Sequence, residues 1–262
     1  MKYTHKLPDA SVNAPTKNIL FETVKALAIL ALISVAFFFA LTFALNAVVE
    51  RITPAQEKKL VGLMGFVPDM GKEVKSDYLQ ALTDRLSSCV ELPYEIETLM
   101  IETKEANAFA LPSGKIYITQ GMLQELENEN ELVYIIGHEL GHFKHKHHLK
   151  GLGNSLILAF LSLFLDDNYG NFFEGSLKLS QAKYSQEAEF EADMFGLKVM
   201  ECGYGNVLSS TTMFQRMNDG KKWSHFLDSH PHFSARIEKM KAEIKVKGYT
   251  LNAQVNPLKE KF

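Results

Sequence analysis

Residues 138–142 read His-Glu-Leu-Gly-His, and this stretch decides how the rest of the chain is interpreted. Apolar residues just upstream recur at helical spacing: Leu132, Val133, Ile135 and Ile136. Asn128 with Glu131 after it matches a capping box, so a helix is predicted to begin there. His138 and His142 then project from one helical face, close enough to share a tetrahedral zinc ion. Glu139 between them is the predicted general base.

The motif alone is only moderately specific, because an ordinary amphipathic helix with surface histidines also matches it. A zinc enzyme needs a third protein ligand, and two candidates compete. One is His148, although the glycine that would turn the chain toward the metal is replaced by His145. The other lies in a predicted helix with Glu189 and Asp193 at i and i+4, where one carboxylate can ligate the metal and the other can orient a ligand histidine. The residues alone leave this choice open.

Three further segments extend the pattern on both sides of the motif. Residues 107–123 read Asn-Ala-Phe-Ala-Leu-Pro-Ser-Gly-Lys-Ile-Tyr-Ile-Thr-Gln-Gly-Met-Leu, residues 185–193 read Ser-Gln-Glu-Ala-Glu-Phe-Glu-Ala-Asp, and residues 229–237 contain Ser-His-Pro followed by Arg-Ile. With His147 after the central motif, these segments resemble in order those of the gluzincin metallopeptidase family that includes bacterial HtpX, the CAAX prenyl protease, BepA and LoiP. Gln186 stands where that family has arginine.

The resemblance implies a zincin-type α+β domain, mainly helical with a small sheet, and one zinc ion per chain. It assigns the third metal ligand to Glu189 and places Asp193 behind the ligands. His230 and Arg236 are the implied residues for gating the metal or stabilising the oxyanion, with Tyr184 as a further oxyanion candidate. The resemblance also implies an edge strand on which an extended peptide adds as a further strand: Ile116, Tyr117, Ile118 and Thr119.

Residues 26–49 carry no charged side chain and are predicted to form one transmembrane helix. As a helix they measure about 36 Å, which exceeds the roughly 30 Å hydrocarbon core of a bilayer. A buried core helix would show a polar stripe and a cleaved signal peptide has a shorter apolar region, so both alternatives fit less well. Slightly more basic residues precede the run than follow it, which favours an N-terminus on the inner side of the membrane. In a bacterial inner membrane this orientation predicts a catalytic domain in the periplasm. One span is typical of the singly anchored branch of the family.

The rest of the chain divides around this anchor. The predicted parts are an N-terminal tail at 1–25, the anchor at 26–49, a helical linker leading into the catalytic domain at 50–93, the zinc metallopeptidase domain at 94–250 and a C-terminal tail at 251–262. A second apolar run at 155–165 spans only about 16 Å as a helix, so it is predicted to lie in the core or on a membrane surface. The polar stretch at 166–176 is predicted to be a loop.

Composition argues against nucleic acid as a partner and does not decide whether the two cysteines form a disulfide. The net charge is −3 with an isoelectric point near 6.3, so the chain lacks the basic surface that is typical of nucleic-acid binding. Cys89 and Cys202 lack metal-ligand spacing and either pair in an oxidising compartment or stay as thiols. His145 and His148 are predicted to be solvated if they are not ligands.

These observations predict a zinc-dependent endopeptidase that acts in protein quality control on unfolded or extended polypeptide segments of membrane and envelope proteins. The main alternative is a zinc-stabilised chaperone or scaffold with little hydrolysis. Glu139 favours the enzyme, because a pure metal binder has no need of a carboxylate there. A protease for prenylated peptides is less compatible with the sequence, because one span does not build an intramembrane chamber.

Overall fold

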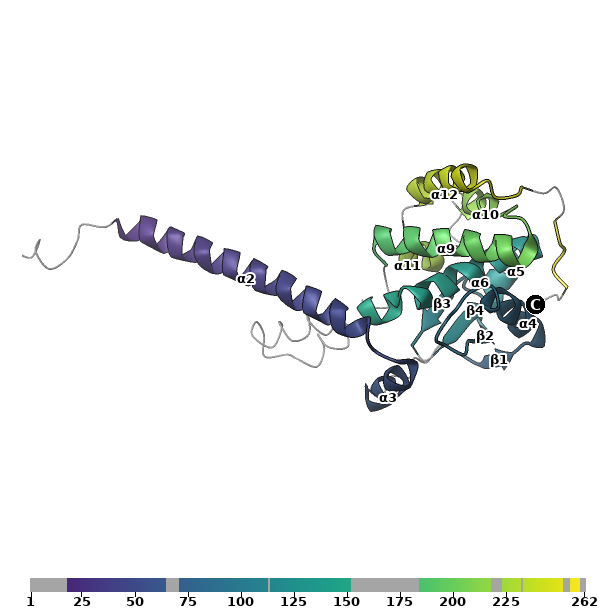
Figure 1. The fold of residues 1–262 in the computed structure, drawn as a ribbon, viewed down its shortest axis with the longest axis horizontal. Coiled ribbons are helices and arrows are strands. Elements are labelled where there is room, and N and C mark those ends of the chain that lie inside the picture. Colours follow the sequence, from purple (N-terminus) through teal and green to yellow (C-terminus); the bar gives the residue numbers. More distant parts are fainter. Residues whose placement is uncertain are drawn as a thin grey trace, which may run out of the picture. The chain divides into compact units, whose positions relative to one another are not determined.

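The computed structural model of the protein describes residues 18–64, 71–112, 114–151, 184–217, 223–231, 233–251 and 255–259 (Figure 1). The chain divides into two compact units, residues 1–44 and residues 45–262. The apolar run at 155–165 and the loop predicted at 166–176 lie outside the described residues.

Helix α2, Ile19–Val49, makes up nearly all of the described part of the first unit and continues past its last residue, 44 (Figure 1). It begins upstream of the predicted residue 26. Within the described residues, α2 is the one helix that is long and apolar enough to cross a membrane, by its length and its mean hydropathy of 2.6. The Ser34 and Thr42 hydroxyls each donate to a backbone carbonyl one turn earlier at 2.9 Å, so they are satisfied within the helix. These features fit the predicted single-pass membrane placement.

The second unit is a mainly helical α+β domain with one small sheet, as predicted. Its helices are α3 (Pro54–Met64), α4 (Asp77–Ser87), α5 (Gln120–Glu125), α6 (Glu129–Lys144), α9 (Gln186–Tyr204), α10 (Thr212–Met217), α11 (Ser224–Ser229) and α12 (Phe233–Lys247). Its strands are β1 (Glu73–Lys75), β2 (Glu97–Ile101), β3 (Ala108–Leu111) and β4 (Lys115–Thr119). Strand β1 lies inside the segment 50–93 that was expected to be helical, so the sheet begins earlier than the sequence indicated.

The sheet has the strand order β1-β2-β4-β3. Strands β2 and β4 are parallel, while β1 and β3 are antiparallel to their neighbours. Gly114 in the turn between β3 and β4 has a φ of +83°, which favours glycine. A Cβ at this position would also overlap the carbonyl oxygen of Glu95, so the tight turn depends on glycine in two ways.

The strand predicted to bind substrate is not at the edge of the sheet, and that prediction is wrong. Strand β4 pairs with β2 on one side and β3 on the other, along the residues that were expected to be free: Ile116, Tyr117, Ile118 and Thr119. Strand β2 pairs in parallel with β4 and so places β4 inside the sheet. Among the described strands, the edge on this side is therefore β3, Ala108–Leu111.

Helices α6 and α9 cross closely because small residues face each other at the crossing (Figure 1). A Cβ on Gly137 would lie 2.8 Å from Val199, and one on Gly141 would lie 2.8 Å from the Cα of Ala192. Such distances are shorter than van der Waals contact, so a larger side chain would push the helices apart. The glycines of α6 therefore allow the metal motif to approach the acidic stretch of α9.

Local capping fixes where these two helices begin. The Asn128 side chain accepts a hydrogen bond from the Glu131 N–H at 3.0 Å, which confirms the predicted start of α6. Ser185 caps α9 in the same way, accepting from the Ala188 N–H at 3.2 Å. Helix α9 ends at Tyr204 and is capped by Gly205, whose φ of +68° suits a left-handed C-terminal cap.

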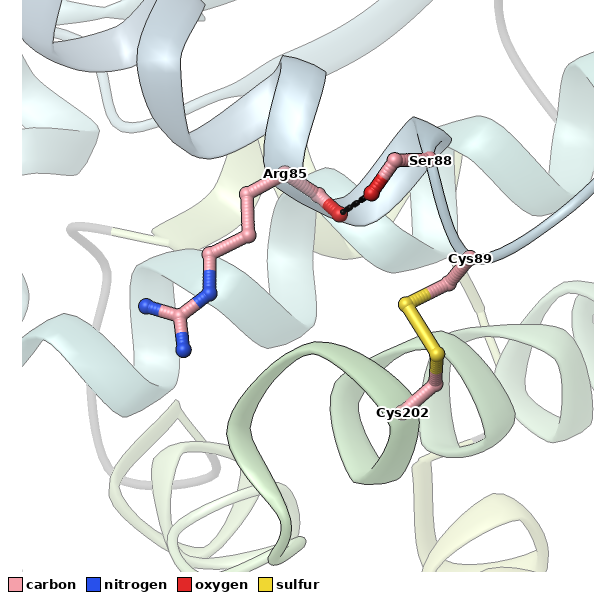
Figure 2. Close-up of a disulfide and its surroundings, with 4 residues drawn as sticks. All are labelled: Arg85, Ser88, Cys89 and Cys202. Atoms are coloured by element: carbon pink, nitrogen blue, oxygen red, sulfur yellow. Dashed lines mark hydrogen bonds between the residues drawn. A yellow bond between two sulfur atoms is a disulfide. The ribbon is translucent and has the colours of Figure 1, made fainter.

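Cys89 and Cys202 form a disulfide that joins the end of α4 to α9 (Figure 2). The two cysteines are separated by 113 residues in the sequence, so the bond closes a long loop. The Arg85 guanidinium on α4 also lies over the Tyr204 ring on α9, at 4.3 Å from its centre. Covalent and non-covalent contacts therefore hold these two helices together.

We expect loss of the disulfide to lower the stability of the domain. Cross-linking a loop of this size removes conformational entropy from the unfolded chain, so the free energy of unfolding of the Cys89→Ser/Cys202→Ser variant should fall by about 2–4 kcal/mol. Urea unfolding measures this change. The chemically reduced parent protein is the matched control and should unfold at the same urea concentration as the variant. Unchanged midpoints for both would contradict the prediction.

Candidate metal centre

Three buried side chains from two helices direct their ligand atoms at one another. His138 and His142 lie on α6 and Glu189 lies on α9, each at most 1% exposed. The Nε2 atoms of the two histidines are 3.1 Å apart. Glu189 Oε2 lies 3.6 Å from His138 Nε2, and Glu189 Oε1 lies 3.6 Å from His142 Nε2. Ligand atoms bound tetrahedrally to one zinc ion at about 2.0–2.1 Å are about 3.3 Å apart. The three side chains predicted as ligands are therefore spaced as a metal ion requires.

His230, at the end of α11, belongs to the same buried cluster. Its Nδ1 is 3.1 Å from Glu189 Oε1 and 3.3 Å from His138 Nε2. Its Nε2 is 3.3 Å from the carbonyl oxygen of Ala108 on β3. The ligand atoms of the four side chains all lie within 4.8 Å of one another. The structure thus brings a residue from near the C-terminus into direct contact with the α6 motif.

Glu139 lies beside this cluster as an unpartnered carboxylate. It is fully buried, and neither of its side-chain oxygens has a hydrogen-bond partner among the described residues. His230 Nε2 lies 3.7 Å from Glu139 Oε1. Burial raises the pKa of Glu139 above its ordinary value. Leaving a buried carboxylate without a partner is costly, so the site fits a cation with its water beside Glu139.

Asp193 and Arg236 form a buried ion pair that contacts His138 through the Asp193 carboxylate. Asp193 Oδ1 lies 2.9 Å from His138 Nδ1, on the side of the ring away from the cluster. The fully buried Arg236 donates through Nε and Nη2 to the two oxygens of Asp193 at 2.8 and 2.6 Å. Its Nη1 contacts Glu189 and donates to the His230 carbonyl oxygen at 3.2 Å. Arg236 thus contacts two carboxylates, Glu189 in the cluster and Asp193 behind it.

The domain sequence matches one family model. The model for Peptidase family M48 matches residues 73–244, which is more than half of the chain. The chain belongs to peptidase family M48. The match contains every residue of the buried cluster, so the predicted resemblance to the gluzincin family of HtpX and LoiP is confirmed.

Several M48 relatives carry names that describe an activity. The mitochondrial metalloendopeptidase OMA1 of Arabidopsis thaliana is 29% identical over 142 residues, which are 52% of this chain and 29% of that protein. Metalloprotease YcaL of Escherichia coli is 28% identical over 156 residues, which are 54% of this chain and 59% of that protein. Metalloprotease LoiP of Escherichia coli is 27% identical over 159 residues, 55% of this chain and 61% of that protein. The chain thus matches less than two thirds of each relative's length.

The alternative third ligand lies elsewhere in this M48 domain. His148 Nε2 is 3.1 Å from Glu57 on α3, and both side chains are buried. The His148 ring also contacts the rings of Tyr94 and Phe143. The expectation of a solvated His148 is therefore wrong, because a helix far earlier in the sequence supplies a buried acidic partner. His145, the C-terminal cap of α6, remains partly exposed as expected.

Tyr184, predicted as an oxyanion candidate, lies against one face of the proposed centre. Its ring is stacked on the His142 ring, with centroids 3.8 Å apart and an angle of 16° between the planes. Burial raises the pKa of the Tyr184 phenol well above its ordinary value, so the phenol stays neutral. Tyr184 precedes the N-cap of α9, Ser185, and its stacking on His142 was not predicted from the sequence.

Proposed function

We propose that the chain is a zinc-dependent endopeptidase in which His138, His142 and Glu189 hold one zinc ion and Glu139 is the general base. The observation that carries this proposal is a ligand set with tetrahedral spacing next to a buried carboxylate that has no hydrogen-bond partner among the described residues. A zinc-stabilised scaffold would gain nothing from Glu139 and would still bear the cost of burying it. Membership of a peptidase family and the names of the relatives agree with the enzyme.

The donor set and its ionisation suit zinc. Two imidazole nitrogens and a carboxylate are a common ligand set of catalytic zinc, which supplies Lewis-acid polarisation of a carbonyl and acidifies water when bound. Burial and the positively charged neighbours hold the pKa of His142 well below its ordinary value, so its imidazole is neutral and able to ligate. Burial opposes ionisation of Glu189, but His230 and Arg236 outweigh it and lower its pKa, so Glu189 is an ionised ligand.

The proton transfers fall to residues that are not ligands. Glu139 is placed to take a proton from the attacking water and to release it to the leaving amine, and its raised pKa favours the first of these steps. His230 Nε2 is the donor that lies close to Glu139, so we assign it to the substrate carbonyl or to gating. Catalytic zinc keeps one position open for water or substrate. His230 fills space beside Glu189 and His138, so we infer that it shifts when a peptide binds.

The substrate is proposed to be an extended polypeptide that adds to strand β3. Strand β3 is the open edge of the sheet beside the centre, because the carbonyl oxygen of its first residue, Ala108, lies 3.3 Å from His230 Nε2. A peptide that pairs with this edge is recognised through its main chain and must be unfolded locally. This mode of binding supports a role in quality control of membrane and envelope proteins, with β3 taking the part first expected of β4.

We propose that α2 anchors the chain in the bacterial inner membrane with the catalytic domain in the periplasm. The Cys89–Cys202 disulfide supports this orientation, because disulfides persist in the periplasm and are rare in the cytosol. In this arrangement 1–25 and 251–262 are tails, 26–49 is the anchor, 50–93 leads into the domain and 94–250 is its catalytic part. Strand β1 makes the sheet begin at residue 73, within the leading segment.

Replacing Glu189 by alanine tests the ligand set. We expect Glu189→Ala to lose zinc and to stop degrading casein, an unfolded substrate, because two imidazoles without the carboxylate make an incomplete site. Zinc content after dialysis and casein degradation are the measurements. His148→Gln is the matched control, since it keeps a polar partner for Glu57 and should retain both zinc and cleavage. Zinc retained by Glu189→Ala but lost by His148→Gln would mean that the third ligand is His148.

A further inference from the structure

His142 is contacted on its far side by polar groups that the proposed reaction does not use. Its Nδ1 lies 2.9 Å from Nδ1 of His147, and His147 Nε2 lies 2.9 Å from Oε2 of Glu191. His142 is fully buried, His147 is 4% exposed and the Glu191 side chain is 51% exposed. The three side chains therefore form one row of polar contacts from the centre to the surface.

An uncommon backbone turn brings His147 back to His142. In a continued helix, a residue five positions later would point about 140° away. Helix α6 ends before this point, and Lys146 adopts a left-handed conformation with a φ of +53°, which is rare for a residue with a side chain. The Lys146 amine donates at 2.8–3.2 Å to three carbonyl oxygens at and after the end of α2: Val49, Glu50 and Ile52. These bonds hold the turn that positions His147.

One arrangement of protons satisfies every contact in this row. A neutral histidine that ligates a metal through Nε2 carries its proton on Nδ1. His142 Nδ1–H then donates to His147 Nδ1, which leaves the proton of His147 on Nε2. That N–H donates in turn to the Glu191 carboxylate. Metal ligation by His142 and the two outer contacts are therefore mutually consistent.

We propose that His147 and Glu191 are positioning residues that fix the tautomer and orientation of His142 for metal binding. The proposal rests on the proposed metal centre and extends it. The arrangement has a counterpart at the other ligand histidine, since His138 Nδ1 lies 2.9 Å from Asp193. Each ligand imidazole thus has a carboxylate on the side away from the metal. Asp193 contacts His138 directly, and Glu191 contacts His142 through the imidazole of His147. Such partners orient the ring and raise its basicity toward the metal.

The same region could be considered as a second cation site, because His145, His147 and Glu191 carry ligand atoms that lie close together. A cation on His147 Nε2 would move the proton of that ring to Nδ1. Two N–H groups would then face each other across the 2.9 Å between His147 and His142. Occupation of such a site therefore opposes ligation by His142. His145 lies 3.8 Å from Glu191 and is not one of the three side chains in the row from His142 through His147 to Glu191.

Zinc affinity, measured by competition with a chromophoric chelator, tests the proposal without any measurement of cleavage. We expect His147→Ala to weaken zinc binding by about 10–100-fold, because His142 loses the acceptor for its Nδ1–H. His147→Asn should recover most of the affinity, since its side-chain oxygen can accept in place of Nδ1. Glu191→Ala changes a half-exposed side chain and should weaken binding in the same direction by a smaller factor. His225→Ala, an exposed histidine beside Glu105, is the control and should bind as the parent does.

The visible absorption spectrum of the Co²⁺-loaded protein is the second measurement, because it responds to ligand geometry and not to a general loss of stability. The spectrum of His147→Ala should differ from that of the parent, while His147→Asn should be close to it. Equal affinity and spectra for the parent and His147→Ala would overturn the proposal. Two zinc ions per parent chain that fall to one in His145→Ala would also overturn it in favour of a cation site. A parent that binds no zinc would refute the proposed metal centre itself.

Discussion

The Glu139→Gln variant should lose peptide hydrolysis by about 10²–10⁴-fold and keep its zinc. Glutamine has the shape of glutamate but cannot take a proton from water at neutral pH. Glu139 stands outside the cluster of mutually close ligand atoms, so the substitution leaves those atoms unchanged. Casein degradation by the purified, zinc-loaded full-length chain in detergent measures the loss, and zinc content measured on the same preparation shows that the metal remains.

The stability of this variant is the internal control. Burial raises the pKa of Glu139, so the folded state binds its proton more tightly than the unfolded state does, and stability falls as the pH rises past the unfolded value. Removing the charge should therefore leave the metal-free variant at least as stable as the parent at neutral pH. Glu187→Gln, an exposed glutamate on α9, should cleave at the parental rate. If Glu139→Gln cleaves casein at the parental rate, the general base is another residue. If neither the parent nor the variant cleaves casein although both hold zinc, the chaperone alternative is favoured.

The proposed ligands on α6 could be predicted from sequence because their geometry depends on one helix. The i and i+4 spacing of His138 and His142 fixes a shared face, and the Asn128 cap fixes where that helix starts. Glu189 is different, since its position depends on how closely α9 crosses α6. That crossing depends on small residues such as Gly141 and Ala192, whose significance is apparent only when the two helices are seen together. The sequence pattern therefore left His148 and Glu189 as candidates for the third ligand, and the family resemblance favoured Glu189.

The features that sequence did not predict all depend on contacts between distant segments. The edge strand is β3, and not β4 as was predicted, because β2, which is earlier in the chain, pairs in parallel with β4. His148 is buried because Glu57 on α3 lies against it. The positioning role of His147 depends on the left-handed turn at Lys146, which carbonyl groups at the end of α2 stabilise. Periodicity describes a single element and carries no information about such pairings.

Truncation of Asp193 should cause the largest loss of stability among single changes near the centre. Its carboxylate accepts from both Nε and Nη2 of Arg236 and from the Tyr134 hydroxyl at 2.6 Å, and all three side chains are at most 1% exposed. Asp193→Ala leaves a buried guanidinium with one carboxylate fewer, so the free energy of unfolding should fall by about 3–5 kcal/mol. Urea unfolding of the metal-free protein measures this. The Asp193→Leu/Arg236→Met variant removes both charges and should recover part of the loss.

The same ion pair predicts how the protein responds to acid. Burial disfavours the Asp193 carboxylate, but Arg236 and His138 outweigh this effect and hold its pKa well below the ordinary value. A carboxyl whose pKa is lowered by folding stabilises the protein above its unfolded pKa of about 4, and this contribution is lost as the pH falls toward the folded value. Stability should therefore decline below about pH 4 in the parent and less steeply in Asp193→Asn. An equally steep decline in the variant would assign acid sensitivity to other carboxylates, and an Asp193→Ala protein as stable as the parent would show that Arg236 is held by Glu189 alone.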